Sequence, residues 1–353
     1  MPAIYRYFVA LCIGIFLYIV ADPIKVGAQS AKMTPTTSGD IWAKTLDAAN
    51  YNEYWNYQMY FDNGMSLYVV FSVSNFGRLK SAVSGIRVSL YGLDGEAYHI
   101  NREYPIADLL QNPQGYEFNI NPRQDNIWFK GSLPEHHEMY INTQKHGHRF
   151  KIHLTFTDIQ QGFKSGTGEY MVDDHRIGIA THIPFARVSG TTGINDNVKD
   201  VSGVAYMDHT WQYQNSSKKL KNGYRFVHLQ DTRNWENVYF METDTRAGTR
   251  FVGYRLSSVD GVVSLQEIQS VSNTSSRDFQ NNRMSISLTG GQKAEISSHS
   301  IMDVTTIFND LNWVTRQLMR TILGGEIMDT RGTAVMLSNG NRKQGFFNQF
   351  AVK

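Results

Sequence analysis

Apolar and polar residues alternate in short runs along most of the chain. In residues 54–61 every second side chain is large and apolar, namely Trp55, Tyr57, Met59 and Phe61. Because successive side chains of a β-strand point to opposite faces of a sheet, this run predicts a strand with one buried face. The same reasoning predicts strands over residues 67–73, 86–91, 97–100, 127–131, 139–143, 149–156, 169–172, 176–183, 204–211, 224–230, 235–243, 250–256, 262–268, 284–288 and 294–299. Many short strands separated by turns are typical of barrels and sandwiches, so we expect an all-β fold.

Residues 190–198 interrupt the strands with a run rich in Gly, Thr and Asn. This composition is typical of the connections between structural units. We therefore expect an N-terminal β domain over residues 40–189 and a C-terminal β domain over residues 190–353.

One later segment follows a helical period instead of a strand period. Its apolar residues recur three or four positions apart, at Ile307, Leu311, Val314, Leu318 and Ile322. Because Gly324 and Gly325 follow as a stop signal, the pattern predicts one C-terminal amphipathic helix. We expect this helix to pack over the mouth or flank of a barrel. Arg316 and Arg320 lie on the same segment, so a peripheral contact with a membrane stays open as the alternative.

Residues 1–28 have the features of a secretory signal peptide. Arg6 precedes an apolar stretch over residues 7–20, and Val26-Gly27-Ala28 offers a small-residue cleavage site. The stretch is short for a spanning helix, which needs about 20 residues, although a retained N-terminal anchor is the alternative. We expect a secreted or bacterial periplasmic protein. Cys12 is the only cysteine, so the mature chain would contain no disulfide and no thiolate metal site.

Composition narrows the range of partners. The formal net charge is +2 at pH 7, which gives no basic stripe for a nucleic acid. The 19 tyrosines, 19 phenylalanines and 6 tryptophans suit β-sheet cores and also pockets for apolar ligands. We therefore expect a hydrophobic small molecule as the partner, and the composition does not set the oligomeric state.

The run from Gly203 to Trp211 combines an acid, an imidazole and large aromatic side chains. Strand alternation puts three of them on one face: Met207, His209 and Trp211. The opposite face carries Tyr206, Asp208 and Thr210. An imidazole beside a π surface suits a site that handles an apolar substrate through a cationic transition state.

Three parts of the chain carry a family resemblance: this run, the preceding segment Ile183-Pro184-Phe185-Ala186-Arg187-Val188-Ser189-Gly190, and the opening run Glu53-Tyr54-Trp55-Asn56-Tyr57 with Asp62-Asn63-Gly64. Together they resemble the AttH/CrtC family of lipocalin-like proteins. That family includes the carotenoid 1,2-hydratases, or hydroxyneurosporene synthases. The resemblance implies two lipocalin-like β-barrel domains side by side. One position departs from the family pattern, because Gln212 stands where a glycine usually follows the tryptophan.

The resemblance also implies a set of site residues. His209 and Trp211 match the His and Trp of the hydratase motif, and Asp231 matches the acid on a following strand, whereas Leu229 stands at the position of a tyrosine. We therefore expect a catalytic set of Asp208, His209 and Asp231, and a substrate-binding set of Tyr206, Trp211 and Leu229. A structural role is the alternative, with Asp208 and His209 hydrogen-bonded across the domain interface and Trp211 in the core.

Several histidines have spacings found in metal sites, namely His136, His137, His146, His148 and His153. Lys145, Gly147 and Arg149 make the middle of this region a basic turn, so we expect solvated side chains and no metal ligands. Asp173-Asp174-His175 is interpreted as an exposed turn in the same way. No phosphate-binding loop or nucleotide fingerprint is visible, and the expected chemistry requires neither a metal nor an organic cofactor.

Two functions remain open at this stage. In the first, the protein is an enzyme that acts on an isoprenoid or lipid-like molecule by cofactor-independent alkene hydration or cyclisation. Asp231 or Asp208 would supply the proton, and His209 would orient water or accept a proton. In the second, the protein is a non-catalytic periplasmic carrier of a hydrophobic ligand, and the motif is structural.

Overall fold

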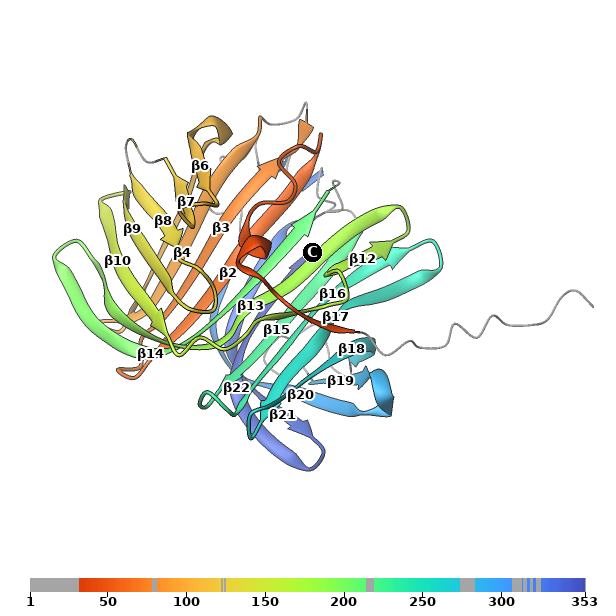
Figure 1. The fold of residues 1–353 in the computed structure, drawn as a ribbon. Helices are drawn as coiled ribbons and strands as arrows, with labels where there is room; N and C mark the ends of the chain where they lie inside the picture. Colours follow the sequence, from red (N-terminus) through yellow and green to blue (C-terminus); the bar gives the residue numbers. More distant parts are fainter. Residues whose placement is uncertain are drawn as a thin grey trace, which may run out of the picture. The chain divides into compact units, whose positions relative to one another are not determined.

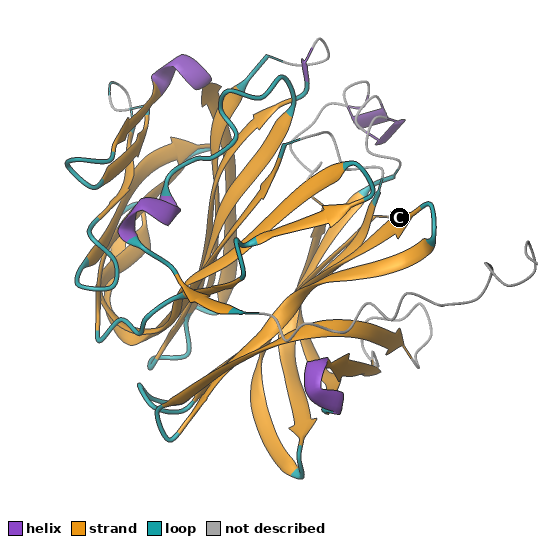
Figure 2. Ribbon diagram, turned by 45° about the vertical axis from the view of Figure 1, so that its right-hand side comes forward, coloured by secondary structure: helices purple, strands orange, loops and turns teal. Residues whose placement is uncertain are grey.

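The computed structural model describes residues 32–77, 81–121, 123, 125–213, 219–273, 283–306, 313, 316–317, 320–321 and 325–352. Most of this part of the chain is β-strand (Figure 2). The strands form two antiparallel barrel-like sheets, which confirms the predicted all-β fold class with two barrels. Short 3-10 turns interrupt them at η1 (Ser38–Ile41), η3 (Ile106–Asp108) and η5 (Thr289–Gly291).

The first fourteen strands form one sheet that curls into a nearly closed barrel, which we call the first barrel. Its strands are β1 (Met33–Pro35), β2 (Tyr51–Phe61), β3 (Ser66–Asn75), β4 (Val83–Leu93), β5 (Glu96–Pro105), β6 (Leu109–Asn112), β7 (Glu117–Ile120), β8 (Asn126–Lys130), β9 (His137–Lys145), β10 (His148–Thr157), β11 (Phe163–Ser165), β12 (Glu169–Val172), β13 (His175–Ile194) and β14 (Asn197–Gln212). The main path runs β5-β4-β3-β2-β14-β13-β10-β9-β8-β7-β6, and β1, β11 and β12 attach beside β13.

The remaining eight strands form a closed barrel, which we call the second barrel. They follow chain order around it: β15 (Leu220–Leu229), β16 (Trp235–Thr245), β17 (Gly248–Val259), β18 (Val262–Asn273), β19 (Arg283–Leu288), β20 (Lys293–Thr306), β21 (Ile327–Ser338) and β22 (Asn341–Val352). Barrel closure leaves no free sheet edge. No strand was predicted for β21 or β22, where buried polar side chains such as Asp329 and Arg331 interrupt the apolar pattern.

The long strands β13 and β14 lie between the other strands of the first barrel and the second barrel (Figure 1). Strand β14 pairs with β2 on one side and with β13 on the other. The inner face of β14 joins the core of the first barrel through Ala205 and Met207. Its outer face contacts the second barrel, where Tyr206 packs with Val227 of β15.

The chain leaves the first sheet after Gln212 and enters the second barrel at Leu220. Residues 190–198, which composition favoured as the domain boundary, form instead the hairpin that joins β13 to β14. Asn195 takes a positive φ of 55° at its tip, a conformation that asparagine adopts more readily than most residues. The polar composition of this segment therefore reflects a tight turn within one sheet.

Two predictions fall on residues outside the described ranges. The signal peptide over residues 1–28 is one. The other is the amphipathic helix, because Ile307, Leu311, Val314, Leu318 and Ile322 all lie outside the described residues. Within the part of the chain that the structure describes, no helix is both long enough and apolar enough to cross a membrane.

Candidate functional site

The two faces of β14 separate as alternation predicts. His209 and Trp211 lie on the inner side with their ring centroids 5.0 Å apart. On the outer side, Asp208 and Thr210 bond to side chains of the second barrel. The side-chain assignment made from the sequence is therefore confirmed for the whole run.

His209 forms a short contact with a carboxylate from the neighbouring strand. Glu53 of β2 lies diagonally across from it, because Trp211 pairs with Glu53 and His209 pairs with Trp55. The distance from His209 Nε2 to Glu53 Oε1 is 2.6 Å, and both side chains are fully buried. Charge-assisted hydrogen bonds of this length are the strong class in proteins.

Glu53 is held in place by the segment of residues 36–45, which we call the strap. Its carboxylate accepts hydrogen bonds from the backbone N–H groups of Lys44 and Thr45 and, at 2.7 Å, from the Thr45 hydroxyl. Because Glu53 is the acceptor in each of these bonds, the short contact is best interpreted as His209 Nε2–H donating to Glu53. The opposite ring nitrogen, Nδ1, is buried without a hydrogen-bond partner among the described residues.

Tryptophan rings flank the imidazole. Trp55 stacks on His209 with ring centroids 4.6 Å apart and an interplanar angle of 16°. The Trp55 indole N–H donates to the Ile41 carbonyl oxygen in the strap at 2.6 Å, and the Trp211 N–H donates to Glu169 at 3.2 Å. Each buried indole therefore has a fixed orientation as well as a hydrogen-bond partner.

A second buried histidine, His182, lies near His209, and their ring centroids are 5.6 Å apart. The pairing of β13 with β14 is irregular between Thr181 and Ile183, and such bulges re-aim side chains. Burial, reinforced by the charge of nearby His209, lowers the pKa of His182 well below its ordinary value. His182 is therefore neutral near pH 7, with one donor and one acceptor nitrogen, and neither has a partner among the described residues.

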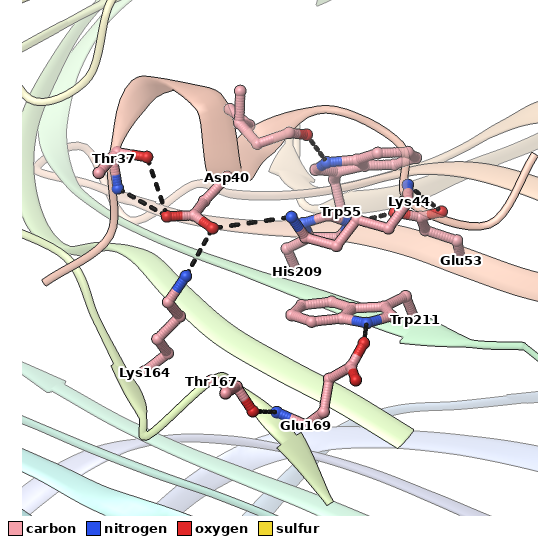
Figure 3. Close-up of polar contacts among 11 residues, drawn as sticks. Thr37, Asp40, Lys44, Glu53, Trp55, Lys164, Thr167, Glu169, His209 and Trp211 are labelled. Atoms are coloured by element: carbon pink, nitrogen blue, oxygen red, sulfur yellow. Dashed lines mark hydrogen bonds and ion pairs between the residues drawn. The ribbon is translucent and has the colours of Figure 1, made fainter. Parts of the chain in front are cut away.

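Charged side chains cover this buried group (Figure 3). Asp40 of the strap bonds to Lys164 at 2.6 Å and lies 3.7 Å from Lys44. Burial alone would raise the pKa of Asp40, but hydrogen bonds from Lys164 and Thr37 and the charge of Lys164 lower it well below the usual range. Lys44 also lies over the Trp211 ring, 5.1 Å from its centroid. The strap therefore closes the site with a charged layer over a buried His–Glu pair.

Asp208 points toward the second barrel, as in the structural alternative drawn from the sequence. Its oxygens accept two bonds from Arg225 of β15, at 2.7 and 3.0 Å, and a third from Asn56. This fully buried ion pair joins the two barrels and faces away from His209. Tyr206 lies on the same outer face, where burial raises the pKa of its hydroxyl well above the ordinary value.

Asp231 and Leu229 lie apart from His209. Asp231 is in the turn between β15 and β16, where its carboxylate accepts bonds from the backbone N–H groups of Arg233 and Asn234, both at 2.8 Å. The Arg233 N–H, together with the other bonds of this turn, lowers the pKa of Asp231, whereas a proton donor at neutral pH needs a raised one. Leu229 packs in the contact between the barrels. Asp231 was expected in one catalytic set with His209, but the carboxylate that contacts His209 is Glu53.

The other histidines lie in separate settings, and His137 is buried where a solvated side chain was expected. His137 is buried, bonds to the Tyr57 hydroxyl at 2.9 Å, and has its pKa lowered to about 3 by burial. His153 bonds to Glu138 at 2.6 Å, and His146 occupies a turn with a positive φ of 52°. In the described ranges no group of three His, Cys, Asp or Glu side chains is arranged to hold a metal ion.

Sequence reasoning missed Glu53, His182 and the strap. A signal for Glu53 was present, because the alternation of Trp55, Tyr57 and Met59 extends back to it and places a lone acid on an apolar face. His182 likewise interrupts the apolar run of β13. Such a buried polar residue needs a partner, but its identity depends on pairing between distant strands.

No protein-family model and no curated protein sequence matches this chain. Among solved structures, a provisionally named AttH protein of Nitrosomonas europaea is similar, with a TM-score of 0.58 and 13% identity over 94% of this chain and 100% of that one. CghA, solved with Sch210972, is similar with a TM-score of 0.62 and 11% identity over 92% of this chain and 94% of that one. Kievitone hydratase of Nectria haematococca is similar with a TM-score of 0.53 and 9% identity over 92% of this chain and 96% of that one. At these identities the likeness establishes the fold alone.

Proposed function

We propose that this protein is an enzyme that transfers protons to and from a hydrophobic substrate, with His209 as the catalytic residue and Glu53 as its partner. The observation that carries the proposal is the 2.6 Å contact between His209 Nε2 and Glu53 in a fully buried, tryptophan-lined setting. A carboxylate so close supplies the counter-charge that a buried imidazolium needs. The reaction we infer is addition of water to an alkene.

The inferred reaction would use His209 twice, first as a proton donor and then as a proton acceptor. His209 Nδ1–H would protonate one alkene carbon, and the alkene π electrons would form the new C–H bond. Water would then attack the resulting cation, and the neutral Nδ1 would take the proton released by that water. The Trp211 ring lies 5.0 Å from His209 and would stabilise the cation through its π face. His182 is neutral and has no hydrogen-bond partner among the described residues, and it would hold the attacking water.

Substrate entry would require the strap to move, because Glu53, Trp55 and His209 are all fully buried beneath it. Polar contacts tie the strap to the first barrel, including Asp40 with Lys164 and the Thr36 N–H with the Gly162 carbonyl oxygen. Ile41 of the strap also packs in the core of that barrel, so this side chain would have to move with it. Closing such a cover excludes water other than the reacting molecule and strengthens electrostatic interactions inside.

The test incubates the purified protein with a panel of isoprenoid alkenes and prenylated phenols in water enriched in heavy oxygen. Wild type should yield labelled alcohol, detected by mass spectrometry. His209→Asn and Glu53→Gln should each lower the rate by about a hundred- to ten-thousand-fold, whereas Asp231→Asn, in its exposed turn, should keep the wild-type rate. Near-ultraviolet circular dichroism confirms that each variant is folded.

Full turnover in His209→Asn would refute the proposal. If wild type labels none of the panel and an organic extract of the protein contains a bound hydrophobic molecule, the carrier function replaces the enzymatic one. The known hydratase among the structural neighbours supports the choice of hydration as the first reaction to test.

A further inference from the structure

The interior of the second barrel is closed at one end by buried charges. On β16, alternation places Glu236, Val238 and Phe240 on the inner face. Glu236 is fully buried and forms ion pairs with Arg255 of β17 and, at 2.5 Å, with Lys343 of β22. This group fills the end of the barrel near the turn between β15 and β16.

The opposite end holds a cavity of about 380 Å³. Its apolar wall includes Phe240, Phe251, Met284 and Tyr224. Tyr224 is stacked between two rings, with its centroid 5.8 Å from Phe240 and 5.7 Å from Phe347. The volume lies at the small end of the range for ligand pockets, about 300–1,000 Å³, and suits a molecule with one or two rings.

Two polar groups give this cavity directionality. Tyr224 is 1% exposed, and its hydroxyl has no hydrogen-bond partner in the geometry of the described residues. Burial raises the pKa of this hydroxyl, and the nearby Ser298 offsets part of the rise. Glu242, six residues along β16 from Glu236, lies about 20 Å from it and is half-buried. Its carboxylate accepts a bond from the Asn222 amide and forms no ion pair among the described residues. The cavity therefore combines an aromatic wall with a carboxylate that has no cationic partner among the described residues.

We propose that the second barrel binds a lipophilic ammonium compound. The apolar body would lie between Tyr224, Phe240 and Phe251, and the ammonium group would bond to Glu242 beside Asn222. Aromatic faces attract cations as well as apolar rings, so both halves of the site favour the same ligand class. This site is separate from the pair of His209 and Glu53, which lies in the first barrel.

The test compares naphthylmethylamine, which is charged at pH 7, with the uncharged naphthylmethanol of the same shape, using isothermal titration calorimetry on the full mature chain. The amine should bind wild type about tenfold or more tightly than the alcohol, as expected for a charge-assisted hydrogen bond. Glu242→Gln should remove this preference by weakening amine binding alone. Phe251→Ala should weaken both compounds.

Asp244→Asn is the matched control, because the substitution removes the same charge two residues away on β16. The Asp244 carboxylate is already paired with Lys221 at 3.3 Å. It should leave the preference unchanged, and His209→Asn should also bind the amine normally even though it loses turnover. Equal binding of amine and alcohol to wild type, an unaltered preference in Glu242→Gln, or no saturable amine binding would each overturn the proposal.

Discussion

Replacing Asp208 with asparagine should destabilise the protein by removing the charge that Arg225 needs. The two side chains are 0% and 4% exposed and meet through bonds of 2.7 and 3.0 Å. The Arg225 guanidinium also lies 3.9 Å from the Tyr239 ring centroid, which fixes its position between the barrels. In Asp208→Asn the guanidinium stays buried, and an amide N–H₂ group faces the donors of Arg225 and Asn56.

Removing one partner of a buried ion pair typically costs about 3–5 kcal/mol, against a total stability of about 5–15 kcal/mol for a folded protein. With a urea m-value of about 3 kcal/mol per molar, the unfolding midpoint should fall by about 1–1.7 M. Urea titration followed by tryptophan fluorescence measures this shift directly. Asp208→Asn should remain folded in buffer but with a much smaller margin.

Asp231→Asn is the control, because its side chain can still accept the turn's N–H bonds and its midpoint should stay near that of wild type. The double variant Asp208→Leu/Arg225→Met should recover part of the loss, since both charges are gone. Recovery should be incomplete because Asn56 then lacks an acceptor, at a cost of about 1–3 kcal/mol. An Asp208→Asn midpoint equal to that of Asp231→Asn would refute the structural role. A normal midpoint combined with lost turnover would return Asp208 to the catalytic set.

Three further predictions concern other parts of the chain. Gly178→Ala would place a Cβ atom 1.8 Å from the Trp211 ring, so it should lower stability by about 1–3 kcal/mol and alter the near-ultraviolet circular dichroism; an unchanged spectrum would contradict the packing. The lowered pKa of Asp40 means that its stabilisation is present above the unfolded value, about 4, and is lost as pH falls below it. Thermal melts from pH 6 to pH 2 should therefore fall less steeply in Asp40→Asn than in wild type, and parallel curves would count against the strap contact. After export, N-terminal sequencing should begin near Asp22 or Gln29, whereas an intact Met1 on a soluble protein would rule out the leader.

Local alternation was enough to predict which side chains of β14 share a face. The strand is regular from Gly203 to Gln212 where it pairs with β2, and a period of two cannot drift along such a strand. The partner of His209 could not be predicted in the same way. Glu53 is 156 residues away in sequence, and no local pattern specifies which of many strands will lie beside β14.

For Asp231 to act with His209, β15 would have to lie beside β14, and strands consecutive in sequence are commonly neighbours in a sheet. Here both edges of β14 are already occupied, by β2 and β13, so β15 cannot pair with it and begins a new barrel. The carboxylate that contacts His209 lies instead on a preceding strand, β2. The Gly-rich segment at residues 190–198 was expected to separate the domains, but it forms a hairpin within one sheet. Composition could not distinguish the two cases, because a turn within a sheet uses the same residue types as a turn between sheets.

The division of β14 into two faces connects stability to the proposed chemistry. Asp208 and Thr210 fix the strand to the second barrel through Arg225 and Tyr239, while His209, between them in sequence, points into the first barrel. Because a strand backbone transmits any displacement to both faces, the contact between the barrels also sets the position of the imidazole relative to Glu53. A catalytic group must be held within about half an ångström of its working position. The second barrel therefore has a structural reason to accompany the first, in addition to any ligand that its own cavity binds.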